Sequence, residues 1–376
     1  MAGIYVHIPF CASRCVYCGF YSTTLKPAMQ HRYTQALEKE MALRHDYLSP
    51  AEHIDTIYIG GGTPSQLSSA DIRHLFAALH RTYSAYGTTQ REVTFEANPD
   101  DVDATLAATL RECGVNRVSM GAQTFDAHRL RFLHRRHTSG QVEQAIDTLR
   151  ANGIGNISID LIYGFPTQTV GQWEEDIDRA TSLGVDHISA YSLMYEEGTA
   201  LHAMLERGEI EEVDEEASLA MYDVLVEKLR AAGYEHYEIS NFARPGKRAV
   251  HNSSYWNDTP YMGLGAAAHS YNRTSRQWNV ADVRRYVEAI EAGEVLAEAE
   301  AIDEDTHYDD LITTALRTSD GLDLNMLDGA HKDYLLKCAK PYLQSGQLEM
   351  RGERVRITAK GIFVSDMIMS DLMKVD

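Results

Sequence analysis

Strand-like and helix-like segments alternate through the first 200 of the 376 residues. Short runs rich in β-branched residues predict strands at 4–8, 54–59, 91–97, 115–121, 156–162 and 185–193. Between them, helical periodicity predicts helices near 28–46, 69–84, 102–113, 139–152 and 170–183. Repeated strand–helix units joined by right-handed crossovers form a parallel sheet. We therefore predict an α/β fold in which residues 1–200 form a partial (β/α)6 TIM-like barrel.

The alternation stops beyond residue 200, which predicts a change of architecture. Residues 201–300 are expected to form an α+β extension, with an acidic helix at 211–232, a strand at 234–240, a turn region at Gly263–Ser270 and a helix at 281–292. An acidic linker, Glu294–Asp305, follows. Residues 301–376 predict a small winged-helix-like domain, with helices at 306–318, 323–329, 331–345 and 359–373 and strands at 347–350 and 354–357.

Composition and charge narrow the class of protein. The formal net charge is −20, and phosphate binding needs a basic surface, so we expect no nucleic acid partner. No stretch approaches the roughly 20 apolar residues that span a bilayer, and no basic segment followed by an apolar one indicates a secretory signal. Five cysteines, three of them clustered, fit a reducing compartment better than a disulfide scaffold. These features predict a cytoplasmic protein without stable membrane insertion.

Cys11, Cys15 and Cys18 follow the first predicted strand with the spacing C-x3-C-x2-C. Cysteine thiolates hold iron–sulfur clusters, and a 4Fe-4S cluster has four irons to ligate. Three thiolates leave one iron open for a small molecule, whereas a structural site usually closes its coordination shell. The spacing favours such an open cluster. A zinc site that lacks a ligand and three unrelated thiols are the alternatives.

A second motif follows the second predicted strand. The run 54–59 leads directly into Gly60, Gly61 and Gly62, and then into Thr63 and Pro64. Glycine lets backbone groups approach a ligand closely, although a glycine run alone is usually a turn. Gly-Gly-Gly-Thr-Pro about forty residues after the cysteine motif resembles the radical S-adenosylmethionine (SAM) superfamily. This resemblance implies that SAM chelates the open iron and that one electron cleaves it to methionine and a 5'-deoxyadenosyl radical.

Polar residues at the ends of other predicted strands belong to the same edge of the barrel. Glu96 ends the third strand, Gln123 follows the fourth, and Asp160 lies near the end of the fifth. Sites in such barrels lie at the carboxyl ends of the strands, and buried polar residues need partners. A ligand bound at that edge is the simplest partner for them.

The whole chain further resembles the branch of this superfamily that contains the oxygen-independent coproporphyrinogen III dehydrogenases and the HemW-type heme chaperones. By this resemblance, Tyr5, Gly61 and Glu96 contact the SAM on the cluster. Positions that contact a second SAM in the dehydrogenase match Tyr17, Gly62, Thr63, Gln123, Arg135, Asp160 and Met194. A guanidinium can grip a carboxylate through two hydrogen bonds, which suits Arg135 to such a role. A solvated charge in a basic run is the alternative for Arg135.

Departures from the dehydrogenase pattern favour the chaperone. The dehydrogenase has a further cysteine two positions after the third ligand, where this chain has Phe20. The dehydrogenase also has a long arm before its first strand. In this chain the first strand is predicted to start near residue 4. His7, just before the cysteines, is expected to orient their loop and not to bind iron.

The segment 251–256 resembles the H-N-x-x-Y-W pattern of the heme chaperones. Imidazole is a common axial ligand of heme iron, and aromatic rings offer flat apolar faces to a porphyrin. We expect this segment to contact heme across the barrel mouth, with His251 as ligand or pocket residue beside Asn252, Tyr255 and Trp256. A histidine satisfied by backbone in a buried turn is the alternative. His269 is a second candidate heme contact.

Together these features predict a heme chaperone that binds a 4Fe-4S cluster, one or two SAM molecules and heme. Its expected partners are a heme-accepting apoprotein and an electron donor such as a flavodoxin or ferredoxin. Oxygen-independent oxidative decarboxylation of coproporphyrinogen III is the main alternative function, and chemistry on another tetrapyrrole is a third. The residues leave open whether SAM is cleaved, which residues would be catalytic and what the oligomeric state is.

Overall fold

A computed structural model describes residues 1–24, 27–84 and 91–374. Its central feature is a 12-stranded sheet in the order β12-β11-β10-β9-β1-β2-β3-β4-β5-β6-β8-β7. Six neighbouring parallel strands form its middle: β1 (Ala2–Ile8), β2 (Ile54–Gly61), β3 (Glu92–Ala97), β4 (Arg117–Gln123), β5 (Asn156–Tyr163) and β6 (His187–Ser192). The strands are buried along most of their length, as expected for a parallel sheet covered on its faces. The predicted α/β fold with a partial barrel is confirmed.

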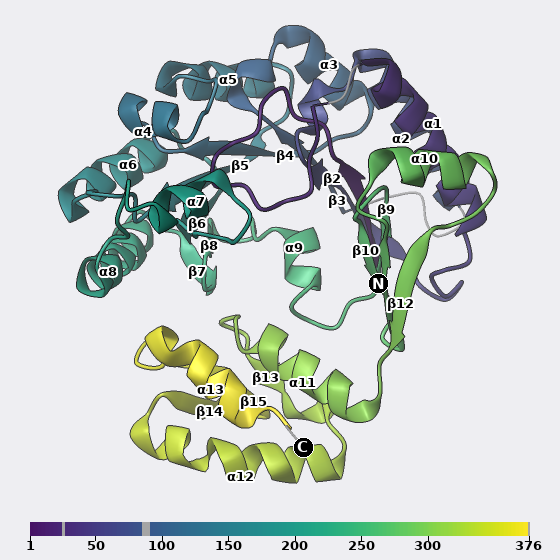
Figure 1. The fold of residues 1–376 in the computed structure, drawn as a ribbon. Coiled ribbons are helices and arrows are strands. Elements are labelled where there is room, and N and C mark those ends of the chain that lie inside the picture. Colours follow the sequence, from purple (N-terminus) through teal and green to yellow (C-terminus); the bar gives the residue numbers. More distant parts are fainter. Residues whose placement is uncertain (25–26, 85–90, 375–376) are drawn as a thin grey trace.

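Helices follow the strands and cover the outer face of the sheet (Figure 1). They are α1 (Pro27–Leu43), α2 (Ser69–Tyr83), α3 (Ala104–Glu112), α4 (Ala127–Phe132), α5 (Ser139–Ala151) and α6 (Val170–Ser182). In α2 the side chain of Ser68 accepts a hydrogen bond from the backbone N–H of Asp71 and so caps the first turn. Ile72, Leu75 and Leu79 then recur at helical spacing and are buried in the core. Local sequence therefore determines both where this helix begins and which face it buries.

The sheet extends beyond β1 through four strands that follow residue 260. β9 (Tyr261–Leu264) pairs with β1 in parallel, and β10 (His269–Tyr271), β11 (Ser275–Asn279) and β12 (Ala297–Ala301) continue the sheet in antiparallel pairing. α10 (Val283–Glu291) lies between β11 and β12 in the chain. The predicted linker Glu294–Asp305 was therefore wrong in part, because β12 lies within it. Its sequence, Ala-Glu-Ala-Glu-Ala, pairs through its backbone at an exposed edge and shows no apolar signal.

The opposite edge of the sheet is completed by a short hairpin. α7 (Ala200–Glu206) and α8 (Glu215–Ala231) lead to β7 (Glu235–Glu238) and β8 (Asn241–Ala243), and β8 pairs antiparallel with β6. α9 (Val250–Ser254) follows this hairpin. The backbone N–H groups of Val250 and His251 donate to the carboxylate of Glu92, at 2.8 and 2.9 Å. Because Glu92 is the first residue of β3, α9 lies at the amino ends of the parallel strands.

Residues 304–374 form a module with its own hydrophobic core (Figure 1). It consists of α11 (Glu304–Ala315), β13 (Leu322–Asp323), α12 (Gly329–Ser345), β14 (Leu348–Arg351), β15 (Arg354–Ile357) and α13 (Ser365–Leu372), with a sheet in the order β13-β15-β14. The predicted helix at 323–329 was wrong, because residues 322–323 pair with β15 and Leu324–Met326 form a single 3-10 turn. Backbone hydrogen bonds join this C-terminal module to the β7 region, including one of 2.9 Å from Ser319 to Tyr237.

Two ends of the barrel are distinguished below. The mouth is formed by the carboxyl ends of β1–β6 and the loops that follow them, and the floor is formed by their amino ends together with α9. The C-terminal module lies on the floor side (Figure 1). Within 1–24, 27–84 and 91–374, no helix is long and apolar enough to cross a bilayer.

Candidate functional site

The three clustered cysteines lie on one loop at the mouth, the cysteine loop, residues 9–24. Cys11, Cys15 and Cys18 are half-buried free thiols. Backbone hydrogen bonds between the two ends of the loop, Cys11 to Thr23 at 2.9 Å and Thr23 to Pro9 at 2.7 Å, give it a defined path. The ring of His7 bonds the carbonyl of Tyr21 at 3.0 Å through Nε2, which confirms that His7 orients this loop.

Two hydrogen-bond donors contact the sulfurs of the cysteine loop. Thr63 donates its hydroxyl to Cys11 Sγ at 3.4 Å, and the guanidinium of Arg135 donates to Cys15 Sγ at 3.7 Å. Burial raises the pKa of the Cys11 and Cys18 thiols, and neighbouring thiols raise it further. Three mutually interacting thiols with hydrogen-bond donors fit a 4Fe-4S cluster, where each thiolate bonds a different iron. Among the described side chains, no three or more His, Cys, Asp or Glu residues are arranged to hold a single metal ion.

The glycine-rich end of β2 lies directly beside this loop. A Cβ on Gly62 would lie 3.0 Å from Cys11 Sγ, so only glycine leaves the sulfur its space. Gly61 has a φ of 113°, a conformation that favours glycine, and its N–H donates to Glu96 Oε2 at 3.1 Å. The other carboxylate oxygen of Glu96 accepts from the Tyr58 hydroxyl at 2.6 Å. Burial raises the pKa of Glu96 to about 7, although the Tyr58 and Gly61 hydrogen bonds oppose this shift.

Arg135 joins the cysteine loop to β3 and β4. Its Nη2 donates to the side chain of Asn98 at 2.8 Å and to the carbonyl of Gly121 at 2.7 Å. Its Nε is buried and has no hydrogen-bond partner within 1–24, 27–84 and 91–374, so one donor of the guanidinium stays available. Among the residues described, Arg135 is therefore an oriented, largely buried cation and not a solvated surface charge.

Asp160 and Tyr17 lie close enough to Arg135 for their charges to interact. Burial raises the pKa of Asp160 to about 6, whereas a hydrogen bond from Ser189 and the charges of Arg117 and Arg135 lower it. Burial also raises the pKa of the Tyr17 hydroxyl, and Arg135 opposes that shift. Gln123 ends β4 with a φ of 64° and is buried, which directs the chain into the mouth.

The rim of the mouth is apolar. Phe20 on the cysteine loop is 72% exposed, Met194 just after β6 is 60% exposed, and Tyr191 on β6 is 40% exposed. Tyr5 on β1 is half-buried, and its hydroxyl bonds His7 Nδ1 at 2.9 Å. Large exposed apolar side chains beside buried polar groups are typical of a binding site for a large, partly apolar ligand.

His269 completes the rim on the β9–β10 side. β9 runs parallel to β1, so the turn after it lies at the mouth, and β10 starts there with His269. Ser270 is buried toward Arg44, which follows α1, so His269 faces the opposite, exposed side of the strand. Its ring is stacked on Trp278 of β11, with 6.1 Å between the ring centroids.

Known proteins resemble this chain in sequence and in fold. Residues 5–180 match the model of the radical SAM superfamily. Over 376 residues, 99% of this chain and 94% of the relative, the chain is 34% identical to the heme chaperone HemW of Mycobacterium tuberculosis. It is 37% identical over 290 residues to HemW of Bacillus subtilis, which covers 77% of this chain and 76% of the relative. The chain belongs to the HemW family of the radical SAM superfamily.

A solved structure extends this similarity to the whole fold. Coproporphyrinogen III oxidase (HemN) of Escherichia coli superposes with a TM-score of 0.83, covering 99% of this chain and 89% of that one at 23% identity. At this identity the similarity concerns the fold alone. This chain and HemN therefore share one architecture, and a shared architecture does not by itself imply a shared function.

The sequence led us to expect the H-N-x-x-Y-W segment across the mouth. In this HemW family member the segment lies on the floor instead. His251 has no exposed surface, and its ring bonds Thr56 Oγ1 at 2.8 Å and the Tyr255 hydroxyl at 2.9 Å. The expectation is corrected for a physical reason, because the β7–β8 hairpin returns the chain beneath the strands. Trp256 lies under the guanidinium of Arg317, 5.2 Å from ring centroid to Cζ. Asn252 is half-buried on the same helix.

Three residues of the site were missed from the sequence. Tyr58 bonds Glu96, and the pairing of β2 with β3 brings these two together. Asn98, just after β3, accepts a hydrogen bond from Arg135, which lies in the loop after α4. Arg117, the first residue of β4, is 1% exposed, and its Nε and Nη1 have no hydrogen-bond partner among the described residues. Its guanidinium lowers the pKa of both Glu96 and Asp160. Alternating polar residues in buried strands were the available signal, but they do not reveal which side chains meet.

Proposed function

We propose that this protein is a heme chaperone which binds a 4Fe-4S cluster and SAM at the mouth of the barrel and passes heme to an acceptor protein. One observation carries the proposal: three free thiols, a glycine-rich strand end and an exposed apolar rim converge at one mouth. Membership of the HemW family supports the same function. The cluster and SAM also agree with membership of the radical SAM superfamily.

In this proposal Cys11, Cys15 and Cys18 each hold one iron. The bound cluster would supply an open coordination site for SAM and a single electron to it. Gly61–Thr63 offer backbone groups to the same ligand. Glu96 would accept hydrogen bonds from the amino group or hydroxyls of SAM. Arg135 would hold a carboxylate through Nε, the donor that has no partner among the described residues.

Further contacts are proposed for the remaining candidates. Tyr5 would line the site of the SAM on the cluster, and Tyr17, Gln123, Asp160 and Met194 would contact a second SAM if one binds. Asp160 is suited to hydroxyl or amino groups because its charge is buried and incompletely compensated.

Heme would bind against the rim of the mouth. Phe20, Tyr191 and Trp278 offer apolar faces for a porphyrin, and Phe20 is the most exposed large apolar side chain among the described residues. His269 is our proposed heme contact on this side, because its imidazole is exposed. Neither ring nitrogen of His251 is free in this structure, so His251 would have to leave two hydrogen bonds to reach iron.

The acceptor would be an apoprotein that receives heme, and an electron donor such as a flavodoxin or ferredoxin would reduce the cluster. Cluster thiols need a reducing environment, so the cytoplasm remains our proposal for the location. Oxidative decarboxylation of coproporphyrinogen III is the second candidate function, favoured by the HemN-like fold. Phe20 argues against it, because the dehydrogenase is expected to have a cysteine there.

One experiment compares the two functions directly. The protein is purified and reconstituted anaerobically, then titrated with heme and assayed with coproporphyrinogen III, SAM and reductant. We expect a saturable Soret band and no protoporphyrinogen. His269→Ala should shift or weaken the Soret band, whereas His80→Ala, on the exposed face of α2, should not. Steady formation of protoporphyrinogen would overturn the chaperone function in favour of the dehydrogenase.

A further inference from the structure

The fully buried ring of His251 lies within a connected set of side chains that leads from the floor to Glu96 at the mouth. We propose that His251 is a positioning residue for the SAM site: it holds the ring of Tyr58, whose hydroxyl orients the carboxylate of Glu96. This inference rests on the proposed function, in which Glu96 contacts SAM. It assigns His251 to the SAM site through Tyr58 and not to heme iron.

Both nitrogens of the His251 imidazole are in use. Nδ1 bonds Thr56 Oγ1 at 2.8 Å, and Nε2 bonds the hydroxyl of Tyr255 at 2.9 Å. Burial lowers the pKa of His251 to about 3, and the charge of Arg117 contributes, so the ring is neutral at physiological pH. A neutral imidazole has one donor and one acceptor nitrogen, and these two hydroxyls occupy them. The ring orientation is therefore fixed from two sides.

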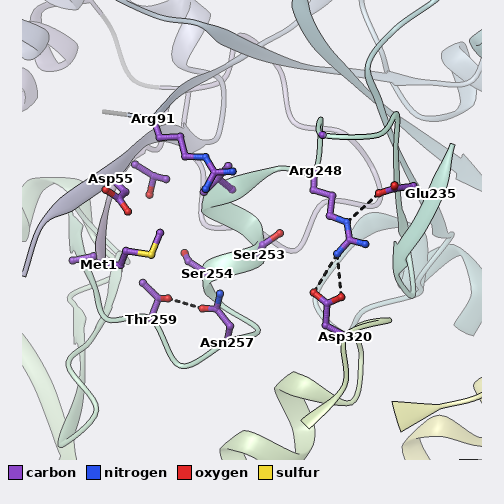
Figure 2. Close-up of a pocket in the computed structure, with 14 residues that line it drawn as sticks. Met1, Asp55, Arg91, Glu235, Arg248, Ser253, Ser254, Asn257, Thr259 and Asp320 are labelled. Atoms are coloured by element: carbon purple, nitrogen blue, oxygen red, sulfur yellow. Dashed lines mark hydrogen bonds and ion pairs between the residues drawn. The ribbon is translucent and has the colours of Figure 1, made fainter. Parts of the chain in front are cut away.

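The helix that bears His251 is itself fixed. Glu92 accepts both backbone N–H groups at its start, which satisfies two of the donors that a helix leaves open. On its other face, Ser253 and Ser254 line a cleft of about 370 Å³ beside Arg248 (Figure 2). α9 thus presents its serines to an open cleft and His251 to the interior of the barrel. A ligand in that cleft would not meet the imidazole.

The His251 ring is packed against Tyr58. The two rings are stacked, with 5.1 Å between centroids and 29° between planes. A Cβ on Gly3 would lie 3.1 Å from His251 Cε1, and a Cβ on Gly60 would lie 2.6 Å from Tyr58 Cε1. Glycines on both neighbouring strands therefore leave the space that these rings fill. Removal of the imidazole would free one face of Tyr58.

The Tyr58 hydroxyl links the position of the Tyr58 ring to the SAM site. It donates to Glu96 Oε1 at 2.6 Å, while the N–H of Gly61 holds Glu96 Oε2 at 3.1 Å. The carboxylate is thus oriented by one donor that depends on His251 and one that belongs to the glycine-rich strand end. If the Tyr58 ring tilts, Glu96 keeps only the Gly61 donor and its carboxylate is no longer fixed from two sides.

The same hydrogen bond favours the charged form of Glu96. The groups that face this carboxyl are Tyr58 on β2, Tyr5 on β1, Arg117 on β4, Asp160 on β5 and Tyr255 after α9. Burial and the charge of Asp160 raise its pKa, whereas the Tyr58 hydrogen bond and Arg117 lower it. Loss of the Tyr58 bond therefore raises the pKa of Glu96 and moves its ionisation to higher pH.

The test measures SAM affinity as a function of pH in the anaerobically reconstituted protein. SAM is titrated against the reduced cluster between pH 6 and 9, and the change in the cluster's paramagnetic resonance reports binding. We expect His251→Ala and Tyr58→Phe to weaken SAM binding about 5- to 10-fold at pH 7 and to shift the pH profile upward. The double variant should lose little more than either single one, because both changes act on one contact.

Two further variants separate positioning from a general loss of structure. His251→Phe keeps a ring against Tyr58 and should restore affinity to within about twofold of the parent, although two hydrogen bonds are lost. Ser253→Ala, on the cleft face of the same helix, should leave SAM affinity and its pH profile unchanged. If His251→Ala fails to fold, Tyr58→Phe and His251→Phe still decide between the outcomes.

Three results would overturn a part of this assignment in distinguishable ways. Unchanged SAM affinity and pH profile in both His251→Ala and Tyr58→Phe, with the cluster intact, would refute positioning. A Soret band that shifts in His251→Ala while SAM binding is normal would return the residue to heme. Parent-like SAM binding in Glu96→Gln would instead refute the contact between Glu96 and SAM, which belongs to the proposed function.

Discussion

In α9 and the residues just after it, side chains are buried or half-buried, and several are hydrogen-bonded within the fold. The cysteine loop instead presents thiols and an exposed aromatic ring. His251 uses both ring nitrogens, and the hydroxyls of Ser253 and Ser254 bond the backbone of their own helix. On the cysteine loop, three thiols are free and Phe20 is 72% exposed. Both segments carry motifs that resemble binding patterns in the sequence.

This difference shows that a binding motif must be judged by what its atoms have left to bind. Polar groups that already have partners stabilise the fold, and a ligand must break those contacts before it gains new ones. Groups that can still bind a ligand gain from it directly, such as Arg135 Nε, which has no partner among the described residues, and the three cysteine sulfurs, which form no disulfide there. On this criterion we propose that the mouth binds the cofactors and that α9 supports the mouth from the floor.

The largest effect is expected at the cysteine loop. Alanine at Cys11, Cys15 or Cys18 should abolish the cluster, because two remaining thiolates anchor it too weakly. Iron and sulfide content and visible absorption after anaerobic reconstitution measure this. Cys113→Ala and Cys338→Ala are matched controls, since both thiols lie outside the loop and should not matter. Full cluster content in any loop variant would remove that cysteine from the site.

A smaller effect is expected deeper in the mouth. Asp160→Asn keeps the shape of the side chain but removes a buried charge whose pKa is raised to about 6. Thermal stability should be unchanged or higher, because a buried charge is costly. Either the affinity for SAM should fall about tenfold, or fewer SAM molecules should bind per protein. Equilibrium binding and a thermal melt of the same preparation measure both. Lower stability with normal SAM binding would place Asp160 among the structural residues instead.

Sequence alone predicted the parts of the fold that depend on local patterns. Strand and helix periodicity in residues 1–200 gave the parallel sheet, and the spacing of Cys11, Cys15 and Cys18 gave the cysteine loop. Edge strand β12 was not predicted, because its alternating alanines and glutamates lack an apolar signal. Short antiparallel strands of this kind form through backbone pairing with neighbours that the sequence does not identify.

The candidate site was predictable in composition but not in arrangement. Glu96 and Asp160 were found because strand ends converge at one edge. Tyr58 was not, because its role depends on the register that brings its hydroxyl to Glu96. The position of His251 depends on how the β7–β8 hairpin folds back beneath the strands, which is a long-range contact that no local pattern encodes.

The pH dependence of stability offers a finer comparison. The pKa of Glu96 is raised to about 7, above the value of about 4.5 expected in the unfolded chain, so the folded protein holds this proton more tightly. The contribution of Glu96 to the free energy of unfolding is complete below about pH 4.5 and is lost as pH rises through about 7. We expect the free energy of unfolding to fall by about 3 kcal/mol over this range.

Chemical denaturation of the reconstituted protein without SAM, between pH 5 and 8, measures this slope. Glu96→Gln should flatten it, whereas Glu112→Gln, which changes a largely exposed carboxylate, should not. An unaltered slope in Glu96→Gln would mean that the Glu96 carboxyl is charged over the whole pH range and that burial in the mouth does not raise its pKa.

The smallest effect is expected where α9 meets the C-terminal module. Trp256 lies under the guanidinium of Arg317, which also pairs with the buried carboxylate of Glu238 at 3.1 Å. Trp256→Leu removes the cation–π contact, worth about 0.5–1 kcal/mol, and leaves the ion pair. The melting temperature should fall by about 1–3 °C, as measured by a thermal melt.

Cluster content, SAM affinity and the heme spectrum should be unchanged, because Trp256 supports the fold and does not touch the mouth. Trp256→Phe keeps an aromatic face and should recover most of the loss. If Trp256→Leu instead lost heme binding at full thermal stability, the floor would carry a ligand and the contrast between the two segments would fail.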